Sequence, residues 1–145
     1  MTTSIWAAGF APSAPRTAAP ETGTTDRAAA AAFFKALLDA VTAAHLLHFQ
    51  SRSFSQHSAL GSFYSELEDL ADGLIESYQG KYGIVTDYPE GPSLPNNDPI
   101  SFMTKMSDYV RTTRAAVASD SEIQNDIDSI QSLIDSTLYK LTNLQ

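Results

Sequence analysis

Apolar residues recur every three or four positions in four stretches of the chain, which is the spacing of one face of an α-helix. These stretches predict helices at residues 27–49, 56–80, 99–117 and 121–143. The stripe of the first stretch is Phe34, Leu38, Val41, His45 and His48. No stretch alternates as a strand does, so the predicted fold class is all-α.

The other three stripes predict which residues face the core. The second is His57, Leu60, Tyr64, Leu67, Ala71, Leu74 and Tyr78. The third is Phe102, Met106, Tyr109, Thr113 and Ala116. The fourth is Ile123, Ile127, Ile130, Ile134, Thr137, Leu141 and Leu144. The residues expected to start the helices are Asp26, then Ser55 or Gln56, then Asp98 with Pro99, then Ser119 or Asp120.

The connections between the stretches predict how the helices are arranged. Short turns at 50–55 and 118–121 make the first two helices antiparallel, and likewise the last two. Residues 83–97 are proline-rich and can extend ~45 Å at ~3.1 Å per residue, while the second helix is ~40 Å long. This segment can therefore return along the bundle and make helices two and three parallel. The alternative is an up-down-up-down bundle with an oversized loop, which is less favoured because long unstructured loops are uncommon.

Composition narrows the class of protein. The 145 residues, 43% of them hydrophobic, suffice for one domain, which we place at 26–145. The net charge is −8 and the nine Lys and Arg residues are scattered, which argues against nucleic-acid binding. We find no apolar run of ~20 residues and no secretory leader, so we expect no membrane span. There is no cysteine, so a metal site must use imidazole and carboxylate ligands.

Residues 1–25 form an Ala/Pro/Thr-rich arm that cannot bury a core of its own. Trp6 and Phe10 are the large aromatics of the arm. We expect them to anchor it on an assembly partner, and the alternative is a leader without a docking site.

All three histidines lie within thirteen residues, at positions 45, 48 and 57, on stripes predicted to face the core. Glu68, Asp72 and Glu76 recur at every fourth position of the second helix. Histidine and carboxylate ligands together suit iron, manganese or zinc. The alternative is that the histidines bond to the backbone near a turn and the acids form a solvated face.

Helix geometry restricts such a site to an interface between two copies. His57 and Asp72 are fifteen residues apart on one helix, ~22 Å along its axis and about 60° around it. They cannot hold one metal ion within a chain. An antiparallel second copy, related by a two-fold axis near the middle of this helix, brings its acids to the histidines of the first.

The series His45, His57, Asp72, Glu76 resembles the ferroxidase-ligand spacing of the miniferritins, the DNA-protection-during-starvation branch of the ferritin-like superfamily. Residues 45–84 also resemble small phage-encoded ferritin-like proteins of unassigned function. The resemblance implies a ferritin-like bundle with one long crossover, and iron held between two subunits. The chain departs from the miniferritin pattern at three positions: Gly61 replaces an acid, Leu46 replaces a tryptophan, and His48 is additional.

Two functions follow as expectations. The first is a homo-oligomeric metal-binding protein with ferroxidase-like activity, using His45, His57, Asp72 and Glu76, assisted by His48 or Glu68. The second is a structural protein of a phage particle that keeps the bundle without catalysis and docks through its arm. The expected location is the cytoplasm or a phage particle.

Removal of residues 1–25 tests the role of the arm. Burying each large aromatic ring contributes on the order of 2 kcal/mol, so the truncated protein should keep its helicity by circular dichroism but assemble more weakly in sedimentation. A Trp6→Ala/Phe10→Ala variant should weaken assembly similarly. Unchanged assembly of both variants would exclude a docking role.

Overall fold

Four helices form the protein in a computed structural model, which describes residues 26–94 and 97–144. They are α1 (Arg27–Gln50), α2 (Phe54–Tyr82), α3 (Pro99–Val117) and α4 (Ser121–Asn143). The predicted helix bounds lie within two residues of these, and the described ranges contain no strand. The all-α prediction is therefore confirmed. The arm with Trp6 and Phe10 lies outside the described residues.

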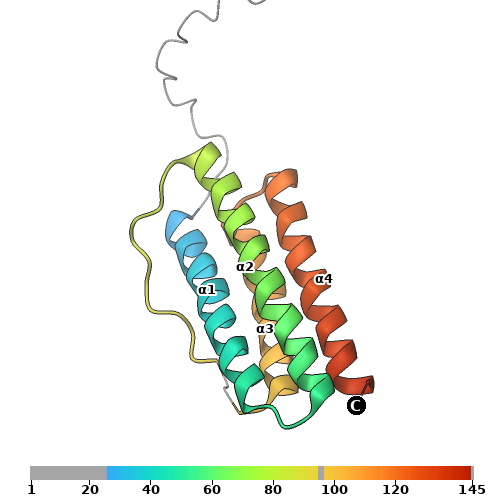
Figure 1. Cartoon of the computed structure of the whole chain (residues 1–145). Coiled ribbons are helices and arrows are strands. Elements are labelled where there is room, and N and C mark those ends of the chain that lie inside the picture. Colours follow the sequence, from blue (N-terminus) through green and yellow to red (C-terminus); the bar gives the residue numbers. More distant parts are fainter. Residues whose placement is uncertain (1–25, 95–96, 145) are drawn as a thin grey trace, which may run out of the picture.

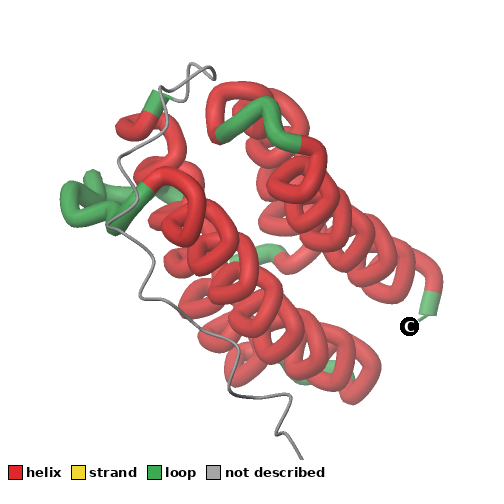
Figure 2. Tube along the Cα trace, turned by 90° about the horizontal axis from the view of Figure 1, so that it is seen from above, coloured by secondary structure: helices red, strands yellow, loops and turns green. Residues whose placement is uncertain are grey.

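The helices pack as a four-helix bundle in which α1 and α4 each contact both α2 and α3. Figure 1 shows α2 and α3 running in the same direction, opposite to α1 and α4. The segment after α2 returns along the length of the bundle beside α1 (Figure 1), and Figure 2 shows it outside the helices. The short turns therefore join antiparallel helices, and the long segment makes the crossover.

Side-chain caps start three of the helices. The Asp26 carboxylate accepts from the N–H groups of Ala28 and Ala29, at 3.0 and 3.2 Å. Asp98 caps α3 in the same way, with Pro99 in the first turn. The cap of α2 is Ser53, which accepts from the Gln56 N–H, so the prediction of Ser55 or Gln56 as the start of this helix is wrong.

Helix α2 ends later than Gly80. Gly83 has φ +88°, in the left-handed region that disfavours other residues, and its N–H donates to the Gln79 carbonyl. Next, the Val85 N–H donates to Gln79 Oε1, and the Val85 side chain is buried. The Arg27 guanidinium donates to the carbonyls of Tyr82 and Ile84, which ties the start of this segment to α1.

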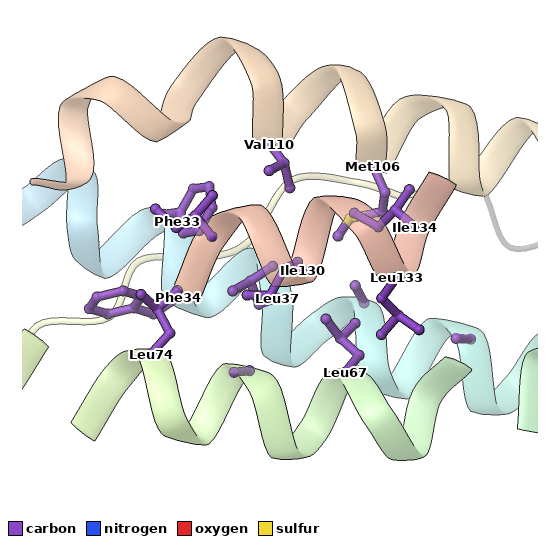
Figure 3. Close-up of a cluster of buried hydrophobic side chains, with 14 of the residues drawn as sticks. Phe33, Phe34, Leu37, Leu67, Leu74, Met106, Val110, Ile130, Leu133 and Ile134 are labelled. Atoms are coloured by element: carbon purple, nitrogen blue, oxygen red, sulfur yellow. The ribbon is translucent and has the colours of Figure 1, made fainter. Parts of the chain in front are cut away.

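Side chains of all four helices meet in one core (Figure 3). Phe33, Phe34 and Leu37 of α1 lie there among leucines of α2 and aliphatic residues of α3 and α4. The α1 residues buried in the bundle include five alanines: Ala30, Ala31, Ala36, Ala40 and Ala44.

The stripe predicted for α1 is buried only at Phe34, whereas the stripe predicted for α2 is buried except at His57 and Tyr64. Leu38 is 36% exposed, His45 and His48 are half-buried, and His57 is exposed. Ala116 and Leu144 are exposed too. Alanine adds little to a hydrophobic pattern because its side chain is small. The larger residues beside the alanines of α1 were therefore assigned to the core. The burial of the alanines turns the histidines toward the outer face of α1 and α2.

Among the helices of residues 26–94 and 97–144, α1 is the one long and apolar enough to cross a membrane, so the expectation that no such stretch exists is corrected. Half of the apolar stretch of α1 is buried inside the bundle. The core helix of a helical bundle can be equally long and apolar.

Asp120 links the start of α4 to the end of α2. It stands at the cap position of α4 but makes no cap hydrogen bond, because its carboxylate accepts from Lys81 Nζ and the Tyr82 hydroxyl. The bond from Lys81, followed by that from Tyr82, lowers the pKa of Asp120. The bond to Asp120 raises the pKa of Tyr82 to about 12.

Asp120→Asn should lower the free energy of unfolding at neutral pH by about 1 kcal/mol. Because the Asp120 pKa is lower in the folded chain, the unfolded chain takes up its proton first as the pH falls. The stabilisation is complete above the ordinary aspartate pKa and disappears as the pH falls through the folded value. Urea unfolding measured from about pH 6 to pH 2 should therefore show a smaller decrease in the free energy of unfolding for the variant than for wild type.

Asp108→Asn serves as the control, since Asp108 is exposed on α3 and its carboxylate makes no hydrogen bond or ion pair with a described residue. Equal acid sensitivity of wild type and Asp120→Asn would contradict the role given to this carboxylate.

Candidate functional site: an aromatic and histidine cluster on α1 and α2

Five rings gather where α1 and α2 face outward together. His45, His48 and Phe49 come from the last turns of α1, and His57 and Tyr64 from the first turns of α2. The His45 ring stacks on Tyr64, with centroids 4.1 Å apart, and on Phe49, at 4.9 Å. The His48 and His57 rings stack at 3.6 Å. All three histidines therefore belong to one cluster.

His48 and His57 are joined by two reciprocal hydrogen bonds. His48 Nδ1 bonds to the carbonyl of His57 at 2.7 Å, and His57 Nδ1 bonds to the carbonyl of His48 at 2.9 Å. Since a carbonyl can only accept, each Nδ1 carries the proton. The alternative of backbone-bonded histidines near a turn therefore holds for these two residues. The same bonds leave each neutral ring with a lone pair on Nε2, the tautomer that a metal ligand needs.

Gly61 of α2 lies close to the His48 ring. A Cβ at Gly61 would lie 3.2 Å from His48 Cε1 and 3.3 Å from His48 Nδ1. A side chain at position 61 would therefore require the His48 ring to shift by a few tenths of an ångström.

His45 borders a hollow of about 420 Å³ between the two helices. The hollow is lined by Val41, Thr42, His45, Leu46, Phe49, Tyr64 and Glu68. No described residue makes a hydrogen bond to either ring nitrogen of His45. The structure thus brings His45 and Glu68 to the same hollow, where an imidazole and a carboxylate are open to a ligand.

Asp72 and Glu76 lie apart from the histidines. Both are exposed, and at ~100° per residue they stand ~40° and ~80° further around α2 than Glu68. Glu68, Asp72 and Glu76 make no ion pair with any residue in the described ranges. Within 26–94 and 97–144, no group of three or more histidine and acidic residues of one chain could hold a metal ion. A site that combines the histidines with Asp72 and Glu76 thus requires two chains.

Two residues of the cluster were missed or misplaced in the sequence. Phe49 was not singled out, although it follows His45 by four residues and so must lie beside it on a helix. Tyr64 was assigned to the core stripe, but it is half-buried at the edge of the hollow, and Phe63 takes the buried position.

The chain belongs to a family of unknown function, DUF5856, whose model matches residues 48–141, about two thirds of its length. It is also similar to the uncharacterised 14.6 kDa protein from the mobD–ri intergenic region of Enterobacteria phage T4. The identity is 29% over 100 residues, which cover 68% of this chain and 76% of the phage protein. No solved structure matches the chain. The phage relative agrees with the resemblance to small phage proteins, and neither match bears a ferritin name.

Alanine substitutions at two glycines of α2 measure how closely His48 packs. Gly73→Ala meets no atom within 4 Å and should raise the free energy of unfolding by about 1 kcal/mol through helix propensity. Gly61→Ala must displace the His48 ring and so weaken one of its hydrogen bonds. The free energy of unfolding of this variant should therefore be about 1 kcal/mol lower than that of Gly73→Ala. Urea unfolding gives both values, and equal gains would show that the ring is not held in place.

Proposed function

We propose that the protein is a ferritin-like metal-binding protein whose site forms between two copies of the chain. The metal is iron, with zinc or manganese as the other candidates. The observation that carries the proposal is the pair of Nδ1 hydrogen bonds, because they fix two exposed or half-exposed imidazoles in the metal-binding tautomer.

The available donors fit these metals. Imidazole nitrogens of His45, His48 and His57 would come from one chain, and the partner subunit's Asp72 and Glu76 would supply the oxygens, with Glu68 beside His45. Gly61 offers no ligand, so the donor set suits one metal position per site better than two. Iron, when bound, supplies the electrons for the reduction of peroxide or oxygen.

The topology supports a ferritin-like relationship. Helices α2 and α3 are parallel and joined by a segment that spans the bundle, which is the connection found in ferritin-like bundles (Figure 1). The net charge of −8 also favours the capture of cations.

A second candidate is a structural protein of a phage particle without catalysis. It is favoured by the phage relative and by exposed apolar residues at the end of the bundle near the α1–α2 turn. Leu46, Phe49 and Phe54 are 50%, 71% and 86% exposed there. Such a protein would dock through this end or through residues 1–25, and would bind no metal at the histidines.

Replacing both distant acids separates the two candidates. Asp72→Asn/Glu76→Gln keeps side-chain size and removes charge from exposed positions, so the fold should survive while Mn²⁺ or Fe²⁺ binding falls at least tenfold and ferrous oxidation stops. Glu66→Gln/Asp108→Asn is the control with the same change of charge, since both residues are exposed, Glu66 on α2 and Asp108 on α3, and neither is a proposed ligand.

Calorimetry with Mn²⁺ measures metal binding. An oxygen-free assay with Fe²⁺ and added hydrogen peroxide, which accepts the electrons, measures ferrous oxidation. Wild-type protein that binds no iron, zinc or manganese at neutral pH would leave the structural candidate in place of the metal-binding one.

A further inference from the structure

The hollow beside His45 is built by two packed helices of a single chain. Val41, His45 and Phe49 follow one another at every fourth position of α1, so they stand on one side of that helix. Tyr64 and Glu68 have the same spacing on α2 and form the opposite wall. The volume of about 420 Å³ lies within the range of small-molecule sites.

The polar groups of the hollow are open to a ligand. Glu68 makes no ion pair with a described residue, and none of the described residues forms a hydrogen bond with the His45 ring nitrogens or the Tyr64 hydroxyl. A carboxylate, a phenol oxygen and the unprotonated nitrogen of a neutral imidazole all accept hydrogen bonds. The two walls therefore present acceptors to one and the same ligand.

The charge of the hollow favours a cation. Among the described residues that line it, Glu68 is the one acid and none is a lysine or arginine. Apart from Arg52, residues 36–80 contain no lysine or arginine, and Lys35 is paired with Asp39. Aromatic faces attract cations as carboxylates do, so the two kinds of group act together on an ammonium ion.

The rest of the lining is apolar and partly open to solvent. Leu46 and Phe49 are 50% and 71% exposed, and Val41 is half-buried. The Phe49 and Tyr64 rings, which stack on His45, give the hollow an aromatic rim. Covering this surface stabilises a bound molecule that has an apolar body. The ligand that fits is therefore cationic at one end and apolar at the other.

We infer that this hollow binds a small organic cation, a primary ammonium ion on an aromatic or short aliphatic body. The ammonium group donates to Glu68 and His45, and the body covers Val41, Leu46 and Phe49. The site belongs to one chain and needs no metal ion, so the inference goes beyond the proposed function. A bound cation also occupies two of the proposed metal ligands and competes with a metal ion for them.

Titration of the full chain with three probes of similar shape tests the selection by charge. The probes are phenethylammonium, the neutral 2-phenylethanol and the anionic 3-phenylpropionate, added in the presence of EDTA and followed by NMR. Phenethylammonium should bind with a Kd of about 0.1–1 mM, as expected for so small a ligand. The alcohol should bind at least tenfold more weakly, because it lacks the charge, and the anion should not bind.

A substitution at Glu68 tests the position of the site. Glu68→Gln keeps the size of an exposed side chain, so helicity should be unchanged, while phenethylammonium should bind at least tenfold more weakly and 2-phenylethanol equally well. Glu66→Gln is the matched control, because it makes the same change on α2 outside the hollow. In wild type, the ring resonances of His45 and Tyr64 should shift on titration, and those of Tyr139 on α4 should not.

Three results would overturn the inference. Equal affinities for phenethylammonium and 2-phenylethanol would show an apolar surface without selection by charge. Equal losses in Glu68→Gln and Glu66→Gln would reduce the effect to the net charge of the protein. If neither phenethylammonium nor butylammonium binds at concentrations on the order of 10 mM, the hollow is not a site for organic cations. Each of these results leaves the proposed metal site untouched, because the titrations contain EDTA.

Discussion

The close packing of α1 into the bundle is the contact on which the other features of this protein depend. Alanines occupy half or more of the buried positions of this helix, so its backbone can approach α2 and α3 closely. This packing fixes the rotation of α1 about its axis. The rotation turns Leu38, His45 and Phe49 toward the outer surface. His45 and Phe49 line the hollow together with Tyr64 and Glu68 of α2. The candidate site is thus a consequence of how the core is filled.

The α1–α2 turn is closed by polar contacts. His48 and His57 satisfy each other's backbone carbonyls, and Gly61 provides the space in which the His48 ring lies. At the other end of α2, the Asp120 carboxylate accepts hydrogen bonds from Lys81 and Tyr82 and so joins α2 to α4. The core fixes the helix faces, and these two polar contacts hold the ends of α2.

The distribution of charge on α2 bears on how the protein functions. Glu68, Asp72 and Glu76 form a row of carboxylates that makes no ion pair with the residues the structure describes, so these like charges repel one another. Imidazoles with free Nε2 atoms lie at the other end of the same helix. The imidazoles and the carboxylates thus lie toward opposite ends of α2, which is why the proposed site takes its ligands from two chains.

The sequence by itself determined the four helices, the caps at Asp26 and Asp98, and the all-α class, because helical periodicity and capping are local properties. It also indicated the crossover, since a proline-rich segment of that length can span the bundle. Periodicity also placed most of the buried residues of α2 and α4. The tertiary structure alone decided which stripe of α1 is buried, because alanines carry little hydrophobic signal and count only when another helix packs on them. It also decided that His48 and His57 bind each other's carbonyls and that Gly61 makes room for a ring. Those contacts join residues nine and thirteen positions apart across a turn, and no local rule specifies them.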